Sequence, residues 1–212
     1  MAVPLCGFVV PVAQAAPIGQ DSLMGFAYTT RRGKTYYLHT GPKRGGGIQY
    51  FVSTDPEGPV CDAVPEGSEI YETPNGRVYL RKKKPALIES AELALVEKEL
   101  EKLQTSKHCY LAEVSGKDII VHEGDTGIER LREINVRFSA RGLEEWAARN
   151  ANYMPVMRFV LVDAVRRVFA PERYCFRGSV EDWVSIGEPG PLGKLASRYL
   201  KHLGKDSIYE LY

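Results

Sequence analysis

The dipeptide Asn75-Gly76, set between two β-rich runs, constrains the fold of this chain more than any other feature. Asn-Gly is the preferred pair for a two-residue type I′ turn, because both residues tolerate positive φ. The flanking runs, SEIYETP and RVYLRK, are rich in residues that favour strands. A type I′ turn would place Tyr71 opposite Leu80 and Thr73 opposite Val78. The sequence therefore predicts a tight antiparallel hairpin.

A second hairpin is predicted earlier in the chain, where residues 25–40 read GFAYTTRRGKTYYLHT. If Arg32-Gly33 is its two-residue loop, Tyr28 lies opposite Tyr37. The segment that follows, GPKRGGG, has the composition of a flexible basic loop. Ile48–Ser53 is then a third strand.

The remainder of the chain alternates helical and strand patterns. The predicted elements are a helix from about Ala91 to Gln104 capped by Ser90, a hairpin over Cys109–Glu123, short helices over Ile128–Ile134 and Gly142–Asn150, strands over Tyr153–Val162, Arg167–Phe176 and Val180–Ile186, and a C-terminal helix from Pro191 to about Leu203. Because the hairpins are short and the helices come late, the predicted fold class is α+β with mostly antiparallel sheet, one central helix after Pro85 and one C-terminal helix.

Three segments make up the predicted organisation. Residues 1–24 form a disordered leader, 25–85 a basic, tyrosine-rich β module, and 86–212 an α+β module, with the two modules free to share one core. The leader contains Ala13-Gln14-Ala15, a shape that signal peptidase cleaves, but it has no Lys or Arg before its apolar run. An unstructured leader and a secretion signal both remain open, as does Met24 as the biological start.

Charge is unevenly distributed along the chain, although the net charge is only +1. Residues 25–84 contain ten Lys or Arg and six Asp or Glu, whereas residues 85–212 contain eighteen and twenty. The front module is therefore the part expected to meet a polyanion.

We expect that this module is a non-enzymatic binding module, with nucleic acid as the favoured ligand. Cations at loop tips reach phosphates, and exposed rings stack on bases. The residues of this predicted surface are Tyr28, Arg31, Arg32, Lys34, Tyr37, Lys43, Arg44, Lys82, Lys83 and Lys84. The surface requires GPKRGGG to fold back, so that Lys43-Arg44 lies on the same side of the sheet as the Arg31–Lys34 tip. Ordinary strand tyrosines and solvated turns explain the same residues.

Two alternative functions remain open. One is a small enzyme acting through Cys175, which lies between Arg173 and Arg177, or through the His122 region. His108, Cys109 and His122 also suit zinc, but no HExxH or CxxC spacing fixes a site. The sequence therefore assigns no catalytic residue, metal or cofactor. The other alternative is a protein-interaction component that uses an edge strand of the front sheet.

Cysteine usage and hydropathy indicate the compartment. The four cysteines are far apart and form no CxxC pair, which favours reduced thiols and a cytoplasmic location. No apolar run reaches the ~18–20 residues of a membrane helix, so no membrane partner is expected.

The hairpin motifs also carry a resemblance. YTTRRGKTYYLH, EIYETPNGRVYLRK, YCFRGSVEDW and GKDSIYEL resemble segments of a family of uncharacterised bacterial proteins, from about Met24 to the end of the chain. The resemblance implies that the leader is not part of the common domain. It implies no activity, cofactor or partner.

Overall fold

The computed structural model describes residues 25–103, 109–127, 139–177 and 180–211. The chain divides into two compact units, Met1–Lys83 and Lys84–Tyr212, called here the N-terminal and C-terminal units. The predicted leader and the predicted helix Ile128–Ile134 lie outside the described residues.

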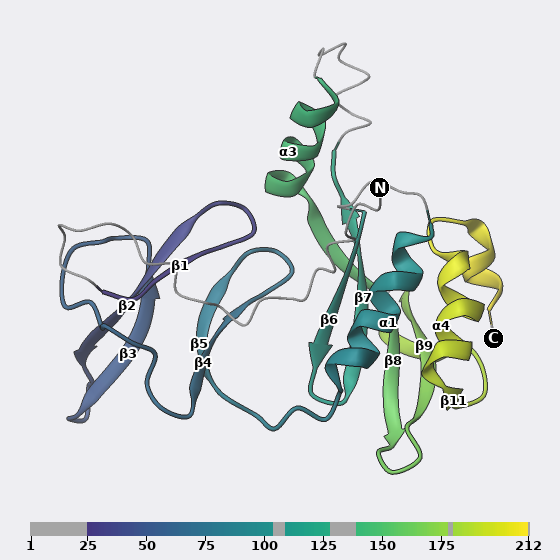
Figure 1. Cartoon of the computed structure of the whole chain (residues 1–212), viewed down its shortest axis with the longest axis horizontal. Helices are drawn as coiled ribbons and strands as arrows, with labels where there is room; N and C mark the ends of the chain where they lie inside the picture. Colours follow the sequence, from purple (N-terminus) through teal and green to yellow (C-terminus); the bar gives the residue numbers. More distant parts are fainter. Residues whose placement is uncertain (1–24, 104–108, 128–138, 178–179, 212) are drawn as a thin grey trace, which may run out of the picture. The chain divides into compact units, whose positions relative to one another are not determined.

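Two antiparallel sheets form the N-terminal unit (Figure 1). The first has three strands in the order β1-β2-β3, namely β1 (Ala27–Thr29), β2 (Thr35–Pro42) and β3 (Ile48–Ser53). The second is the hairpin of β4 (Ser68–Glu72) and β5 (Val78–Lys82). The prediction of β3 is confirmed to the residue, because its uncharged β-rich run is bounded by glycines before it and a proline-rich segment after it.

Both predicted hairpins are present, but the two-residue loops predicted for them are wrong. In the first, Thr30 N donates to Lys34 O (2.9 Å) and Gly33 N donates to Thr30 O (2.8 Å), which closes a three-residue loop. Tyr28 therefore pairs with Tyr36 and not with Tyr37. Gly33 has φ +77°, so the glycine supplies the left-handed residue of a three-residue hairpin loop rather than of a type I′ turn.

The second hairpin repeats this geometry. Thr73 N donates to Arg77 O (2.8 Å) and Gly76 N donates to Thr73 O (2.9 Å). The register shifts by one residue from the prediction, so that Tyr71 pairs with Tyr79. A one-residue shift exchanges the two faces of a strand. Glu72, rather than Tyr71, therefore shares a face with Val78 and Leu80.

One edge of the three-stranded sheet is covered by the chain itself. Beyond β1, the segment Pro59–Cys61 runs beside β2: Thr40 N donates to Pro59 O (2.9 Å) and Cys61 N donates to Leu38 O (2.7 Å). Leu38 also donates to Phe26 O (3.3 Å) and is fully buried. The backbone groups of Leu38 and Thr40 therefore point away from β3.

The C-terminal unit is an antiparallel meander with the helices over residues 90–101 and 192–199 packed on one face (Figure 1). Its strands are β6 (Tyr110–Ser115), β7 (Asp118–Asp125), β8 (Asn152–Asp163), β9 (Val168–Arg177) and β10 (Val180–Ser185), in the order β10-β9-β8-β7-β6, and the short β11 (Gly190–Pro191) pairs with β9. Its helices are α1 (Ser90–Glu101), α3 (Ala140–Asn150) and α4 (Leu192–Tyr199), followed by 3-10 turns at Leu200–His202 and Asp206–Glu210. Buried Val121, Phe159 and Phe169 of the sheet form one core with Val96 of α1 and Leu195 of α4.

These elements confirm the predicted α+β class with hairpin-built antiparallel sheets. The central helix is shorter than predicted, and its N-cap residue is Glu89 rather than Ser90. Glu89 N donates to the Glu92 carboxylate (2.8 Å), so the side chain three residues into the helix stabilises its first turn in a capping box. No helix in the described residues is long and apolar enough to cross a membrane.

The hairpin geometry predicts a specific glycine requirement. Gly76 has φ +76°, so Gly76→Val should lower the free energy of unfolding by about 1–3 kcal/mol, because a β-branched residue resists positive φ. Gly76→Asn is the control, since Asn tolerates this region. Urea unfolding of both variants measures the difference. Equal losses would show that contact with the Arg32 side chain, rather than φ, sets the cost.

Candidate binding surface of the N-terminal unit

Glu72 of the second hairpin joins the two hairpins of the N-terminal unit by accepting hydrogen bonds from two predicted site residues of the first. Its carboxylate accepts from Tyr28 Oη (2.8 Å), from Arg31 N (3.2 Å) and from Arg31 Nε (3.2 Å). The Glu72 side chain is only 6% exposed. Burial, together with the hydrogen bond to Glu72, raises the pKa of Tyr28 to about 12. Tyr28 and Arg31 are therefore engaged in holding the hairpins together.

The cationic side chains of the predicted tip also contact the second hairpin or a neighbouring ring. Arg31 Nη2 donates to Thr73 O (2.7 Å), and Arg32 Nη2 lies 3.5 Å from Asn75 Oδ1. The Lys34 ammonium lies 5.4 Å from the centre of the Tyr36 ring. The two hairpin loops therefore meet tip to tip.

Lys43 and Arg44 lie at the other end of β2. Lys43 N donates to Gly47 O (3.0 Å) and Gly46 N donates to Lys43 O (2.9 Å), so GPKRGGG continues the β2–β3 hairpin and does not fold back. The eight residues of β2 span about 26 Å, several times the Debye length of ~8 Å. The predicted surface with both cationic groups on one side is therefore wrong.

The other predicted residues do not join these two groups into one surface. Tyr37 is half-buried and pairs with Ala27 and Ser53 on its two sides. Lys82 ends β5 opposite Ser68, Lys83 N donates to Gly67 O (2.8 Å), and Lys84 begins the C-terminal unit.

The outer edge of β3 forms no backbone hydrogen bond with another described strand, although β5 lies close to β3. In an antiparallel pair, alternate residues direct their backbone groups toward the partner strand. Because Leu38 and Thr40 of β2 bond away from β3, their neighbours bond toward it, and the outward-facing residues of β3 are Ile48, Tyr50 and Val52. Among the described residues, no backbone hydrogen bond extends outward from these three positions.

The side chains of this edge are exposed and apolar. Ile48 is 67% exposed, Tyr50 43% and Phe51 45%, whereas Val52 and Ser53 are half-buried at the end of the strand. Natural edge strands are normally protected by a charge, a proline or a bulge. The sequence IQYFVS has none of these. The sequence predicted this strand, but its place at the edge of the sheet depends on the path of the whole chain, which local sequence does not reveal.

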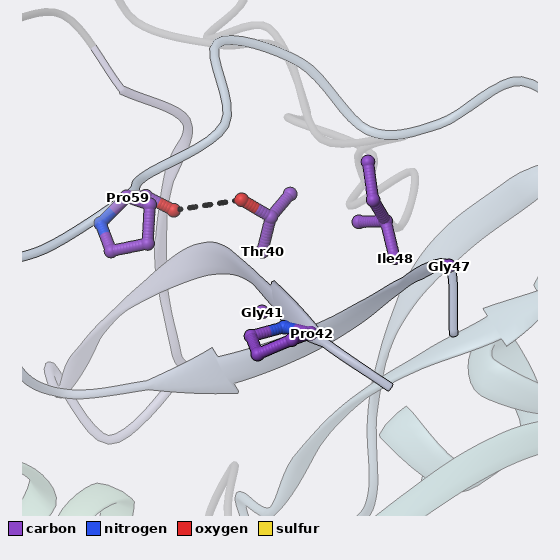
Figure 2. A pocket seen from close by; sticks show the side chains of 6 residues that line it. All are labelled: Thr40, Gly41, Pro42, Gly47, Ile48 and Pro59. Atoms are coloured by element: carbon purple, nitrogen blue, oxygen red, sulfur yellow. Dashed lines mark hydrogen bonds between the residues drawn. The ribbon is translucent and has the colours of Figure 1, made fainter. Parts of the chain in front are cut away.

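A shallow hollow lies over the end of β2, between Ile48 of β3 and Pro59 on the other side of β2, on the face that carries Ile48 and Tyr50. It has a volume of about 380 Å³ and is lined by Thr40, Gly41, Pro42, Gly47, Ile48 and Pro59 (Figure 2). The Thr40 hydroxyl donates to Pro59 O (3.4 Å), which fixes one wall, and the Ile48 side chain forms the other. The lining is largely apolar, so the hollow suits an apolar side chain.

The opposite face of β2 and β3 carries a stacked ring pair. The rings of His39 and Phe51 are 5.4 Å apart and 15° from parallel. His39 is buried, and its Nε2 lies 2.9 Å from Asp55 O, which anchors the segment after β3. Lys43 continues the alternation of His39 and Gly41, so it lies on the same face as Phe51.

The residues of the predicted enzyme alternative are separated by the C-terminal sheet. His122 pairs with Leu111 and lies 3.1 Å from the Glu113 carboxylate. Cys175 alternates with Tyr174 and so shares the face of Phe169, which packs on the helices; His122 shares the opposite face with Asp118. His108 lies outside the described residues, and those residues contain no cluster of metal-ligating side chains.

The face of the sheet opposite the helices carries a polar group that sequence analysis missed. Arg158 bonds to Glu172 (2.6 Å) and Asp118 (3.3 Å), and its guanidinium lies 4.5 Å from the Trp183 ring centre. Strand alternation placed Arg158 opposite the core, but its partners are fixed only by the register of β7 and β9.

Comparison of the chain with family models, with curated proteins and with solved structures gave no match in any of the three. The binding surface is therefore interpreted from its own geometry and charge.

The two cationic groups are expected to respond differently to mutation. Arg31→Ala should lower the free energy of unfolding by about 1–3 kcal/mol, because it leaves the nearly buried Glu72 without its cation. Arg44→Ala is the matched control and should change it by less than about 0.5 kcal/mol, since Arg44 is exposed and forms no ion pair within the described residues. Urea unfolding measures both, and equal effects would contradict the structural role of Arg31.

Proposed function

We propose that this protein is a non-catalytic binding module whose N-terminal unit binds an extended segment of a partner along the open edge of β3. Strand addition of this kind uses main-chain hydrogen bonds for affinity and side-chain pockets for specificity. The observation that carries the proposal is the combination of outward backbone groups at Ile48, Tyr50 and Val52 with exposed apolar side chains on an unprotected strand.

The surroundings of β3 define what the added segment should carry. The hollow beside Ile48 accepts an apolar side chain at one position of the segment. Lys43 and Arg44 lie just before the strand, are exposed, and form no ion pair within the described part of the chain. A segment of alternating apolar and polar residues with acidic residues at one end therefore fits the edge best.

The proposal is tested with synthetic peptides of about ten residues that alternate Val and Thr and end in either two Glu or two Lys. The Glu-ended peptide should bind the full chain more tightly in fluorescence anisotropy, and added salt should weaken this preference. Tyr50→Pro should reduce binding at least about tenfold, because it removes an outward N–H while leaving the β2 ladder intact.

Tyr50→Val is the matched control, since it keeps the N–H and favours a strand. It should retain most of the peptide affinity. Circular dichroism of both variants checks that they remain folded. Binding that is equally lost in Tyr50→Val, or unchanged in Tyr50→Pro, would refute strand addition at β3.

Nucleic acid remains a second candidate ligand on a smaller surface than the sequence predicted. Lys43, Arg44 and the exposed ring of Phe51 support it, because Lys43 and Phe51 share one face and Phe51 is already stacked on His39. Cations beside an exposed ring are the elements that single-stranded nucleic acid requires.

This candidate is tested by retention on a column of immobilised single-stranded DNA. Lys43→Ala with Arg44→Ala should lower the salt concentration at which the protein elutes, and Phe51→Leu should lower it further. Lys82→Ala with Lys83→Ala removes the same charge elsewhere and should have a smaller effect. Equal effects of the two double variants would indicate nonspecific charge and refute this surface.

A further inference from the structure

The charges that flank β3 differ in sign at its two ends. The loop before the strand carries Lys43 and Arg44, and the segment after it carries Asp55 and Glu57. All four residues are exposed. Their positions are fixed: the loop is closed by the Lys43–Gly47 hydrogen bond, and His39 Nε2 lies within 2.9 Å of Asp55 O.

We propose that the segment added to β3 is the β3 strand of a second copy of this chain, paired antiparallel. This inference rests on the proposed function and names its partner. A two-fold axis at Tyr50 places Ile48 opposite the second copy's Val52 and Tyr50 opposite the second copy's Tyr50. All three are outward-facing positions, so their backbone groups meet in register.

The antiparallel arrangement also matches the charges. Each copy places its Lys43-Arg44 end beside the Asp55–Glu57 end of the other, and the two-fold axis repeats this contact. It joins two three-stranded sheets into one continuous sheet of both copies and pairs the outward backbone groups of β3, which have no hydrogen-bond partner within the described residues. A contact made mainly by one strand is small, so we expect weak association.

Analytical ultracentrifugation of the full chain from about 1 μM to about 500 μM tests the proposal. The mass should rise from one chain toward two chains with concentration. Tyr50→Pro should remain monomeric over this range, because the two-fold axis removes two hydrogen bonds at once. Tyr50→Val should still dimerise.

A charge exchange tests the orientation. One variant carries Lys43→Glu and Arg44→Glu; the other carries Thr54→Lys and Glu57→Lys and keeps Asp55, whose carboxylate accepts from Glu57 N (2.9 Å). Each variant alone should be monomeric, because like charges then meet at both ends. An equimolar mixture should form a dimer with one copy of each. Failure of the mixture to associate, when the wild-type chain dimerises, would overturn the antiparallel arrangement.

The remaining outcomes separate this inference from the proposed function. A wild-type chain that is monomeric throughout overturns the second copy as partner, while binding of the Glu-ended peptide in a manner that depends on Tyr50 still supports strand addition. A dimer that persists in Tyr50→Pro shows that the copies associate elsewhere and also overturns the inference.

Discussion

The nearly buried carboxylate of Glu72 is the contact on which the arrangement of the N-terminal unit depends. It accepts hydrogen bonds from a tyrosine and an arginine of the first hairpin, while it belongs to the second. The loss of hydration of a buried carboxylate must be compensated by hydrogen bonds, and here the donors, Tyr28 and Arg31, both come from the β1–β2 hairpin. The consequence for function is direct, because the cations at this end of the sheet serve the fold. Under the proposed function, ligand binding is left to the other end, where Lys43 and Arg44 form no ion pair within the described residues.

The two edges of the three-stranded sheet differ for a reason that lies in the chain's path. After β3 the chain crosses over His39 and returns beside β2, where Pro59–Cys61 takes up the backbone groups that the short β1 leaves unpaired. No described segment does this for β3. An uncharged strand of high β propensity on an uncovered edge is an aggregation hazard, so a specific partner for it is physically reasonable.

Local sequence patterns predicted the strands well and their pairing poorly. β3 and the β6–β7 hairpin follow from β-rich runs bounded by turn residues. The registers of the first two hairpins did not follow, because glycine with positive φ serves both two-residue and three-residue loops. Tyrosines on both faces gave no apolar pattern to decide between them. The Arg31–Glu72 pair joins residues 41 positions apart, and no local signal announces it. The predicted cationic surface failed for the same reason, since its geometry depended on these long-range contacts.

The polarity of charge along β3 also selects between the two ways in which one strand can pair with its copy. A parallel pair would set Lys43 and Arg44 beside the same cations and Asp55 beside the same carboxylate, which is repulsive at both ends. It would also misalign the outward backbone groups, because a parallel ladder requires slanted bonds between offset residues. The antiparallel pair meets both requirements with the same three outward residues. Register, backbone geometry and charge thus favour one arrangement, although each arises from a different part of the chain: the β2 ladder, the IQYFVS strand, and the two segments that flank it.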